Sequence, residues 1–275
     1  MIDLETLIHD ALERNASDIH LTVGEPPIFR LDGELTNFGE VPLTEADTTA
    51  YVQELITPGL LKEFHEMGEA DFAVTYHELV RMRCNVFRQR GMTSLALRLL
   101  PLRIATAEEL GLPPVVVAQA DKPRGLVLVT GPTGSGKSST LAALLDHINH
   151  TERRHIITLE EPIEYLHTSD QCIINQREVG ADTGSFAAGL RAALRQDPDV
   201  ILVGEMRDLE TISTAITAAE TGHLVFGTLH TKGAANTIDR IIDSFPAEQQ
   251  NQIRIQLADV LECAVGQTLL PKIGG

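Results

Sequence analysis

A glycine-rich loop reads Gly131-Pro132-Thr133-Gly134-Ser135-Gly136-Lys137-Ser138, with Ser139 directly after it. The apolar run Leu126–Val129 precedes it and a leucine-rich helical pattern follows it, which is the strand–loop–helix order of a phosphate-binding loop. Glycines let backbone N–H groups point at phosphates, and the helix N-terminus adds the positive end of its dipole. The loop is therefore predicted to bind ATP, with Lys137 reaching the β- and γ-phosphates and the Ser138 hydroxyl helping to hold Mg²⁺.

The stretches around this loop alternate between strand and helix. Apolar, strand-like runs occupy residues 125–130, 155–159, 172–174, 200–203 and 223–229. Helical patterns lie near residues 137–149, 185–195, 208–220, 233–243 and 247–261. Near-continuous apolar strands that alternate with helices predict a parallel sheet with both faces covered. We therefore predict an α/β domain over residues 125–275.

The first hundred residues follow another pattern, in which helices and short strands are mixed. The predicted elements are helices near 2–12 and 44–56, strands near 19–23, 70–76, 80–89 and 92–100, and a hairpin turn at Asp32-Gly33. This predicts a small α+β domain over residues 1–104. The proline-containing residues 105–124 are predicted to form the linker between domains, with one short helix that starts in a capping box at Thr106-Ala107-Glu108-Glu109.

The composition excludes several classes of protein. With 43% hydrophobic and 22% charged residues, the chain is not disordered as a whole, and its net charge of −17 argues against general binding of DNA or RNA. An acidic start and the lack of an apolar stretch of about 18 residues predict no signal peptide and no membrane span. Cys84, Cys172 and Cys263 are too far apart for a zinc site. We expect a reduced, cytoplasmic protein that meets a membrane only through a partner.

Carboxylates follow two of the predicted strands. Glu160 and Glu164 come at the end of the run at 155–159, and Glu205 follows the run at 200–203 after Gly204. Ligands of open α/β sheets bind at the carboxyl ends of the strands. Glu164 and Glu205 are therefore predicted to act on the attacking water and to hold Mg²⁺, the alternative for each being an exposed strand-end charge. The sequence leaves open which of Glu160, Glu164 and Glu205 is the general base.

Two histidines frame the run at 223–229. His223 and His230 are seven residues apart, so alternation along a strand places them on opposite faces and they do not form one metal pair. His230 lies at the carboxyl end of the strand, where we predict that it contacts the γ-phosphate and senses hydrolysis. A purely structural histidine is the alternative for both.

Arginines cluster in the otherwise acidic first domain, at positions 81, 83, 88, 90 and 98. Alternation along the strand at 80–86 places Arg81 and Arg83 on one face, and Arg98 faces away from its apolar neighbours Leu97 and Leu99. We predict that these cations contact the phosphates of ATP on a neighbouring subunit, because an arginine supplied in trans stabilises developing charge. The alternative is a solvated strand face paired with local Asp and Glu.

The motifs resemble those of the type IV pilus retraction ATPases (PilT-like), within the larger group of secretion ATPases. The matching segments are Ser17–Leu21 with Gly24–Pro27, Leu126–Ser138, Thr158–Tyr165, Asn175–Glu178, Asp197–Asp208, Thr221–Thr231 and Phe245–Glu248. They occur in the order of that family and cover nearly the whole chain. Thr158–Tyr165 resembles its acidic "Asp box", Asp197–Asp208 its Walker B segment and Thr221–Thr231 its "His box".

The resemblance implies a ring-shaped homo-hexamer, with a PAS-like amino-terminal domain and a RecA-like P-loop core. It implies that ATP and Mg²⁺ bind where the core of one subunit meets the amino-terminal domain of another. The residues it assigns to the nucleotide, metal and water are Lys137, Ser138, Glu164, Glu205, Arg83, Arg98 and His230. The implied activity is ATP hydrolysis that acts on an inner-membrane platform protein, depolymerises pilin and so powers pilus retraction and twitching motility.

Some features depart from the family pattern. Glu161 stands where the Asp box usually has Asp, which keeps the charge, and Ser139 replaces a more usual Thr. The sequence ends at Gly275, before the further strand and helical tail of family members, so we expect the tail to be missing and ATP binding to be kept. A tetracysteine zinc insert, found in the extension ATPases, is absent, which favours the retraction branch.

Other functions compatible with the same motifs are a non-catalytic or regulatory ATP-binding paralogue and a related secretion-system ATPase. A nucleic-acid motor with the same core is disfavoured by the charge of −17.

Overall fold

The computed structural model describes residues 2–100 and 103–270. The chain divides into two compact units, residues 1–102 and 103–275. Residues 271–275, at the end of the predicted ATPase core, lie outside the described part of the chain. Within the described part, no helix is both long enough and apolar enough to cross a membrane.

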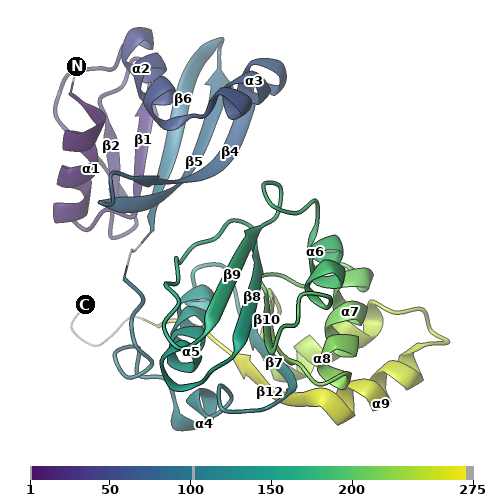
Figure 1. The fold of residues 1–275 in the computed structure, drawn as a ribbon. Coiled ribbons are helices and arrows are strands. Elements are labelled where there is room, and N and C mark those ends of the chain that lie inside the picture. Colours follow the sequence, from purple (N-terminus) through teal and green to yellow (C-terminus); the bar gives the residue numbers. More distant parts are fainter. Residues whose placement is uncertain (1, 101–102, 271–275) are drawn as a thin grey trace. The chain divides into compact units, whose positions relative to one another are not determined.

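A six-stranded parallel sheet forms the centre of the second unit (Figure 1). Its strands are β7 (Gly125–Thr130), β8 (His155–Glu160), β9 (Ile173–Glu178), β10 (Val200–Val203), β11 (Leu224–Leu229) and β12 (Leu261–Gly266), in the order β12-β7-β11-β10-β8-β9. Every residue of β7, β10 and β11 is buried, which explains why these runs are apolar throughout and do not alternate. The sheet confirms the predicted parallel α/β fold.

Helices cover both faces of this sheet (Figure 1). The helices are α4 (Pro114–Val117), α5 (Lys137–Thr151), α6 (Phe186–Ala193), α7 (Leu209–Glu220), α8 (Ala234–Asp243) and α9 (Gln250–Val260). Residues of α4 and α5 share a core with Val127 and Val129, whereas residues of α6 to α9 share another with Leu126 and Leu128. Successive side chains of β7 therefore pack into cores on opposite faces of the sheet, as the alternation of a strand requires.

The register of the sheet brings three strand ends to one level. Val203 of β10 pairs with Leu159 of β8 on one side and with Gly227 of β11 on the other. The segments that follow these strands therefore emerge at the same edge of the sheet. The phosphate loop follows β7, the direct neighbour of β11, and begins at this edge too.

The first unit is an antiparallel sheet with helices on one face (Figure 1). Its strands are β1 (Asp18–Thr22), β2 (Ile28–Leu31), β3 (Glu34–Asn37), β4 (Glu69–Tyr76), β5 (Val80–Gln89) and β6 (Met92–Leu100), in the order β3-β2-β1-β6-β5-β4. The helices are α1 (Leu4–Glu13), α2 (Glu45–Leu55) and α3 (Pro58–Met67). Their apolar residues pack with Ile19 and Leu21 of β1, so the other face of the sheet, which bears Asp18 and His20, is the polar one.

Two local predictions need correction, and two elements were missed. The short helix predicted at Thr106 is wrong: Thr106 and Glu109 bond reciprocally as a capping box does, but the chain there forms turns and the short helix is α4. The strand predicted at 172–174 extends to Glu178 as β9, because an edge strand tolerates polar residues. Helix α3 and strand β12 were not predicted. Helix α3 has apolar residues at helical spacing that were overlooked, whereas β12 contains Glu262 and is only partly buried.

Candidate phosphate-binding site

The glycine-rich loop has a backbone that only glycine adopts easily. Gly131, Gly134 and Gly136 have φ angles of 150°, 76° and 86°, all in the positive region. Helix α5 begins directly afterwards, at Lys137. The Lys137 side chain turns back over the loop, where its Nζ donates hydrogen bonds of 3.0 Å to the carbonyl oxygens of Gly131 and of Pro132. The predicted strand, loop and helix are thus confirmed, with the ammonium group held over the loop.

Gln267, just after β12, packs against the other side of the loop. Its backbone N–H donates to the carbonyl of Thr130 at 2.7 Å, and its Oε1 accepts from the Thr140 hydroxyl at 3.0 Å. A Cβ added at Gly131 would collide with the carbonyl oxygen of Gln267, and one at Gly136 would lie 2.9 Å from its Nε2. Gly131 is therefore required by close packing against backbone as well as by its φ angle, whereas at Gly136 the positive φ angle is the stronger requirement, because the end of the Gln267 side chain can move.

The loop fits an anionic group with several oxygen atoms. The hydroxyl of Ser135 is buried at 3% residue exposure and has no hydrogen-bond partner among residues 2–100 and 103–270, which leaves a donor available to a ligand. Burial lowers the pKa of Lys137, while the negative charges of Glu205 and Glu164 act in the opposite direction. A phosphate oxygen could accept a hydrogen bond from the Ser135 hydroxyl. A phosphate would also give the Lys137 ammonium an anionic partner, which binds it more strongly than the neutral carbonyl groups that it contacts now.

Glu205 and Glu164 are the two carboxylates whose negative charges act on the pKa of Lys137. Glu164 follows β8 and Glu205 follows β10, so both leave the sheet at the edge where the loop begins. The sequence spaces them 41 positions apart, and only the parallel register makes them neighbours of one lysine. Loop, lysine and two carboxylates therefore form one site.

Glu205 is held by two side chains, those of Arg207 and His230. Its Oε2 lies 2.6 Å from the Arg207 guanidinium, and its Oε1 lies 3.3 Å from Nε2 of His230. Burial acts to raise the pKa of Glu205, but the hydrogen bond and charge of Arg207, with a contribution from His230, lower it overall. Arg207 also approaches Glu161 at 3.6 Å and so links the ends of β8 and β10. Glu205 is ionised at neutral pH.

Gly204 occupies the position where Walker B strands usually carry Asp, and the structure supplies a reason. A Cβ at this position would lie 2.9 Å from the carbonyl oxygen of Leu159 and 3.2 Å from Cα of Glu160. The Gly204 N–H donates to that same carbonyl at 2.8 Å. Strands β8 and β10 thus approach too closely here for any side chain.

The two histidines have different surroundings. His230 reaches Glu205, as described above, and is 45% exposed. His223 precedes β11, and its Nδ1 bonds to the carbonyl of Ala218 at 2.9 Å. His223 therefore has a local structural contact at the opposite end of the strand, whereas His230 belongs to the candidate site.

Arg83 and Arg98 lie in the first unit, as direct cross-strand partners on β5 and β6. Both are exposed, whereas Met82, Cys84 and Leu97 beside them are buried. The predictions that Arg83 and Arg98 point away from the buried neighbours on their strands are confirmed, and the pairing of β5 with β6 brings the two arginines side by side. Asp18 pairs with Arg98 in register from β1, with its Oδ1 2.9 Å from the Arg98 Nε.

Among residues 2–100 and 103–270, no three His, Cys, Asp or Glu side chains gather as a metal cluster. Mg²⁺ does not need such a cluster, because it keeps several waters and binds one or two carboxylates together with substrate phosphates. Ser138 at the start of α5, with Glu164 and Glu205, offers a donor set of that kind. The residues present therefore fit a magnesium ion that arrives with a nucleotide.

Several residues of the site were missed from the sequence. Tyr165, in the loop after β8, contacts Ser139, and Gln176 contacts that same loop. Gln267 contacts the phosphate loop, and Arg207 contacts Glu205. Of these, only Arg207 carried a signal, since a cation two residues after a strand-end carboxylate can pair with it. The contacts of Gln176 and Gln267 depend on β9 and β12, the two strands that were underpredicted.

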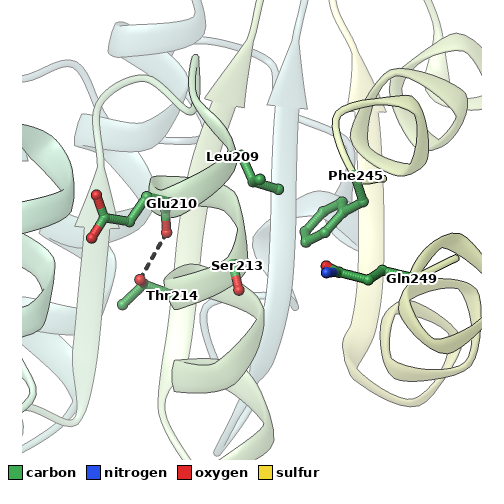
Figure 2. A pocket seen from close by; sticks show the side chains of 6 residues that line it. All are labelled: Leu209, Glu210, Ser213, Thr214, Phe245 and Gln249. Atoms are coloured by element: carbon green, nitrogen blue, oxygen red, sulfur yellow. Dashed lines mark hydrogen bonds between the residues drawn. The ribbon is translucent and has the colours of Figure 1, made fainter. Parts of the chain in front are cut away.

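A hollow of about 360 Å³ opens elsewhere in the second unit (Figure 2). Figure 2 shows Phe245 and Gln249 facing the first turns of α7 at Leu209 and Ser213. None of the six residues that line it belongs to the phosphate loop or to the predicted catalytic set. The candidate site is therefore defined by the loop and the strand ends and does not coincide with this hollow.

The chain is similar to proteins of known activity. The family described as "Type II/IV secretion system protein" matches residues 1–274. The type IV pilus retraction ATPase PilT of Pseudomonas aeruginosa is 49% identical over 274 residues, which cover 100% of this chain and 80% of that protein. A twitching motility protein of Neisseria gonorrhoeae is 46% identical over 244 residues, covering 89% of this chain and 65% of that one.

A solved structure agrees with these similarities. The crystal structure of the pilus retraction motor PilT with bound ADP superposes with a TM-score of 0.95 at 51% identity, covering 100% of this chain and 80% of that one. The match spans both units in one chain, and its sequence identity is far above the level at which only a fold is shared. The chain therefore belongs to the type II/IV secretion system protein family, in agreement with the resemblance of its motifs to those of the pilus retraction ATPases.

Proposed function

We propose that this chain is an ATP-hydrolysing motor subunit that powers type IV pilus retraction. The observation that carries the proposal is the convergence of three groups on Lys137: the glycine-rich loop beneath it, and the carboxylates of Glu164 and Glu205 from two neighbouring strand ends. A structural loop has no need of an ammonium group among such partners. A phosphate loop, a lysine that contacts the phosphates and carboxylates that hold Mg²⁺ or orient the nucleophile are recurring parts of sites for phosphoryl transfer.

Each residue of the site has a proposed role. The loop 131–136 and Ser139 surround the phosphates, Lys137 neutralises their charge, and Ser138 holds Mg²⁺ with Glu164 and Glu205. Mg²⁺ would supply charge neutralisation between the phosphates. Glu205, kept ionised by Arg207, is placed to orient or deprotonate the attacking water. His230, beside Glu205 and exposed to the nucleotide side, is placed to register the loss of the γ-phosphate.

The proposed action of the first unit's arginines on the nucleotide of another subunit requires an assembly of several copies. We assign residues 1–104 to a PAS-like domain, 105–124 to a linker and 125–275 to a RecA-like core, and we propose that six copies assemble into a homo-hexamer. Arg83 and Arg98 then face the nucleotide of an adjacent subunit. Such a ring would work in the cytoplasm at the inner membrane, on a platform protein at the pilus base, without nucleic acid.

The test is the rate of Mg²⁺-dependent ATP hydrolysis per subunit, measured against protein concentration. Turnover should rise steeply with concentration, because a site shared between subunits exists only in the assembled ring. Lys137→Ala should abolish it, whereas Lys62→Ala, which removes an exposed lysine of the first unit, should not. Unchanged turnover in Lys137→Ala would exclude the proposal, and tight ATP binding with no turnover in the unmodified protein would indicate a binding subunit instead.

A further inference from the structure

The Glu160 carboxylate, at the carboxyl end of β8, is occupied by protein donors. Its Oε1 accepts from the Thr158 hydroxyl at 2.6 Å and from Nε2 of Gln176 at 3.2 Å. The backbone N–H of Glu164 also donates to this carboxylate. Three donors from three segments of the chain therefore converge on one side chain that the strand holds in place.

Gln176 extends this contact to the loop after β8. Gln176 is the direct partner of Thr158 across β8 and β9. Its Nε2, besides its bond to Glu160, donates to the carbonyl of Tyr165 at 2.8 Å, and its Oε1 accepts from the backbone N–H of His167 at 2.8 Å. Glu160 and Gln176 together fix the backbone at Glu164, Tyr165 and His167.

Tyr165 connects the fixed loop to the phosphate loop. Its hydroxyl shares a hydrogen bond of 2.7 Å with the hydroxyl of Ser139, in the first turn of α5. Ser139 directly follows the proposed magnesium ligand Ser138. A continuous path of contacts therefore leads from Glu160 through Gln176 and Tyr165 to the helix that begins with Lys137.

We infer that Glu160 is a positioning residue and not the general base. A base needs a lone pair within hydrogen-bond reach of the water that it deprotonates. Oε1 of Glu160 instead accepts hydrogen bonds from two side chains of the protein, Thr158 and Gln176, and the second of these connects it to the loop after β8. What it positions is Glu164, by the backbone N–H, and Tyr165, by way of Gln176. This inference rests on the proposed function, and it narrows the candidates for the base to Glu164 and Glu205.

Four variants test the inference, each assayed for kcat and KM with ATP. Glu160→Ala should lower kcat about 10- to 100-fold, because a side chain that orients ligand groups is typically worth that much. Glu160→Gln keeps one acceptor oxygen and should lose clearly less. Gln176→Ala should match Glu160→Ala, and the double variant should be no worse than either alone, since the two residues act as one unit. Glu220→Gln, an exposed carboxylate on α7, is the matched control and should leave kcat unchanged.

A milder variant covers the event that Glu160→Ala fails to fold. Tyr165→Phe removes only the hydroxyl that contacts Ser139, and should lower kcat roughly 3- to 10-fold, about the value of one hydrogen bond. The same change should have no further effect in the Gln176→Ala background. If Tyr165→Phe and the unmodified protein have equal turnover, the contact of Tyr165 with Ser139 does not influence catalysis, and the proposed path is contradicted.

Other outcomes separate this inference from the proposed function. Equal losses above about 1,000-fold in Glu160→Gln and Glu160→Ala, with Gln176→Ala near normal, would identify Glu160 as the base and overturn the inference while the function stands. Full turnover in Lys137→Ala would remove the function itself. Binding of a fluorescent ATP analogue by each variant, compared with the unmodified protein, shows that any loss lies in turnover and not in folding.

Discussion

Asp18 and Arg98 pair directly across β1 and β6, with the Nε of the arginine donating to Oδ1 of the aspartate at 2.9 Å. The other oxygen, Oδ2, accepts from the Ser17 hydroxyl at 2.7 Å and lies 3.8 Å from Arg30. Asp18 is mostly buried, at 13% side-chain exposure, whereas Arg98 is 56% exposed. A buried anion therefore fixes the base of an exposed cation, beside Arg83 on the next strand.

Asp18→Asn should destabilise the first unit in a pH-dependent manner. Burial opposes the ionisation of Asp18, but the hydrogen bonds of Ser17 and Arg98 lower its pKa below the ordinary value. The contribution of ionised Asp18 to the free energy of unfolding is therefore complete above its pKa in the unfolded chain, about 3.9. It disappears as the pH falls through the lower pKa that Asp18 has in the folded protein. Urea unfolding should show a loss of about 1–2 kcal/mol at pH 7 that vanishes in acid. A constant difference at all pH values would contradict the ion pair as its source.

Mixing two inactive variants should restore activity if the arginines act in trans. Lys137→Ala subunits keep Arg83 and Arg98, and Arg83→Ala/Arg98→Ala subunits keep the phosphate loop. In mixed rings, roughly a quarter of the interfaces would combine the intact halves, so the mixture should recover up to about a quarter of normal turnover. The matched control replaces the Lys137→Ala partner with Lys137→Ala/Arg98→Ala, which should recover much less. Failure to complement, with ring assembly intact by sedimentation, would place the arginines in cis or outside the site.

Gly204→Ala should impair both stability and turnover. The added Cβ would press on the Leu159 carbonyl and on Glu160 and displace the end of β8. Overpacking of this kind typically costs about 1–3 kcal/mol, measurable as a lower urea midpoint. Gly184→Ala is the control, because its Cβ would meet nothing within 4 Å. Normal stability of Gly204→Ala would show that the strands separate more easily than the structure implies.

Glu161→Asp, which restores the residue usual in the Asp box, should change turnover little. Glu161 is 45% exposed and lies 3.6 Å from the more exposed Arg207, and exposed ion pairs are worth about 0–1 kcal/mol. The rate should therefore change less than about fivefold. Glu205→Gln provides the contrast: it removes the carboxylate 2.6 Å from Arg207 and should lower kcat more than about 100-fold. Comparable effects of the two changes would mean that Glu161 touches the reacting groups.

The parts of the site that were predicted correctly depend on local pattern. The conformation of the phosphate loop can be predicted from its glycines, because they occupy the positions where φ is positive. Strand alternation alone places Arg81 and Arg83 on one face. The apolar runs identified the central strands because these are buried on both faces. Such features require no knowledge of which segments become neighbours.

The parts that were missed depend on pairings between distant segments. Gln176 lies in a polar edge strand whose pattern looks like a loop, so its position beside Glu160 could not be predicted. Asp18 meets Arg98 only because β1 pairs with β6, 80 residues along the chain. To decide which of the three glutamates is the general base, one must know which residues each of them contacts. Some of those residues, such as Gln176 and His230, lie far away in the sequence, so the local pattern does not reveal them.

Gln267 connects the end of β12 to the phosphate loop, the part of the protein that is proposed to bind the nucleotide. Gln267 bonds to Thr130 before the loop and to Thr140 after it, 127 residues earlier in the chain. Tension on the segment that leaves β12 would thus be transmitted to the loop across one side chain and one backbone bond. A pull on the chain beyond Gln267 would therefore reach the residues on both sides of the phosphate loop through these two hydrogen bonds.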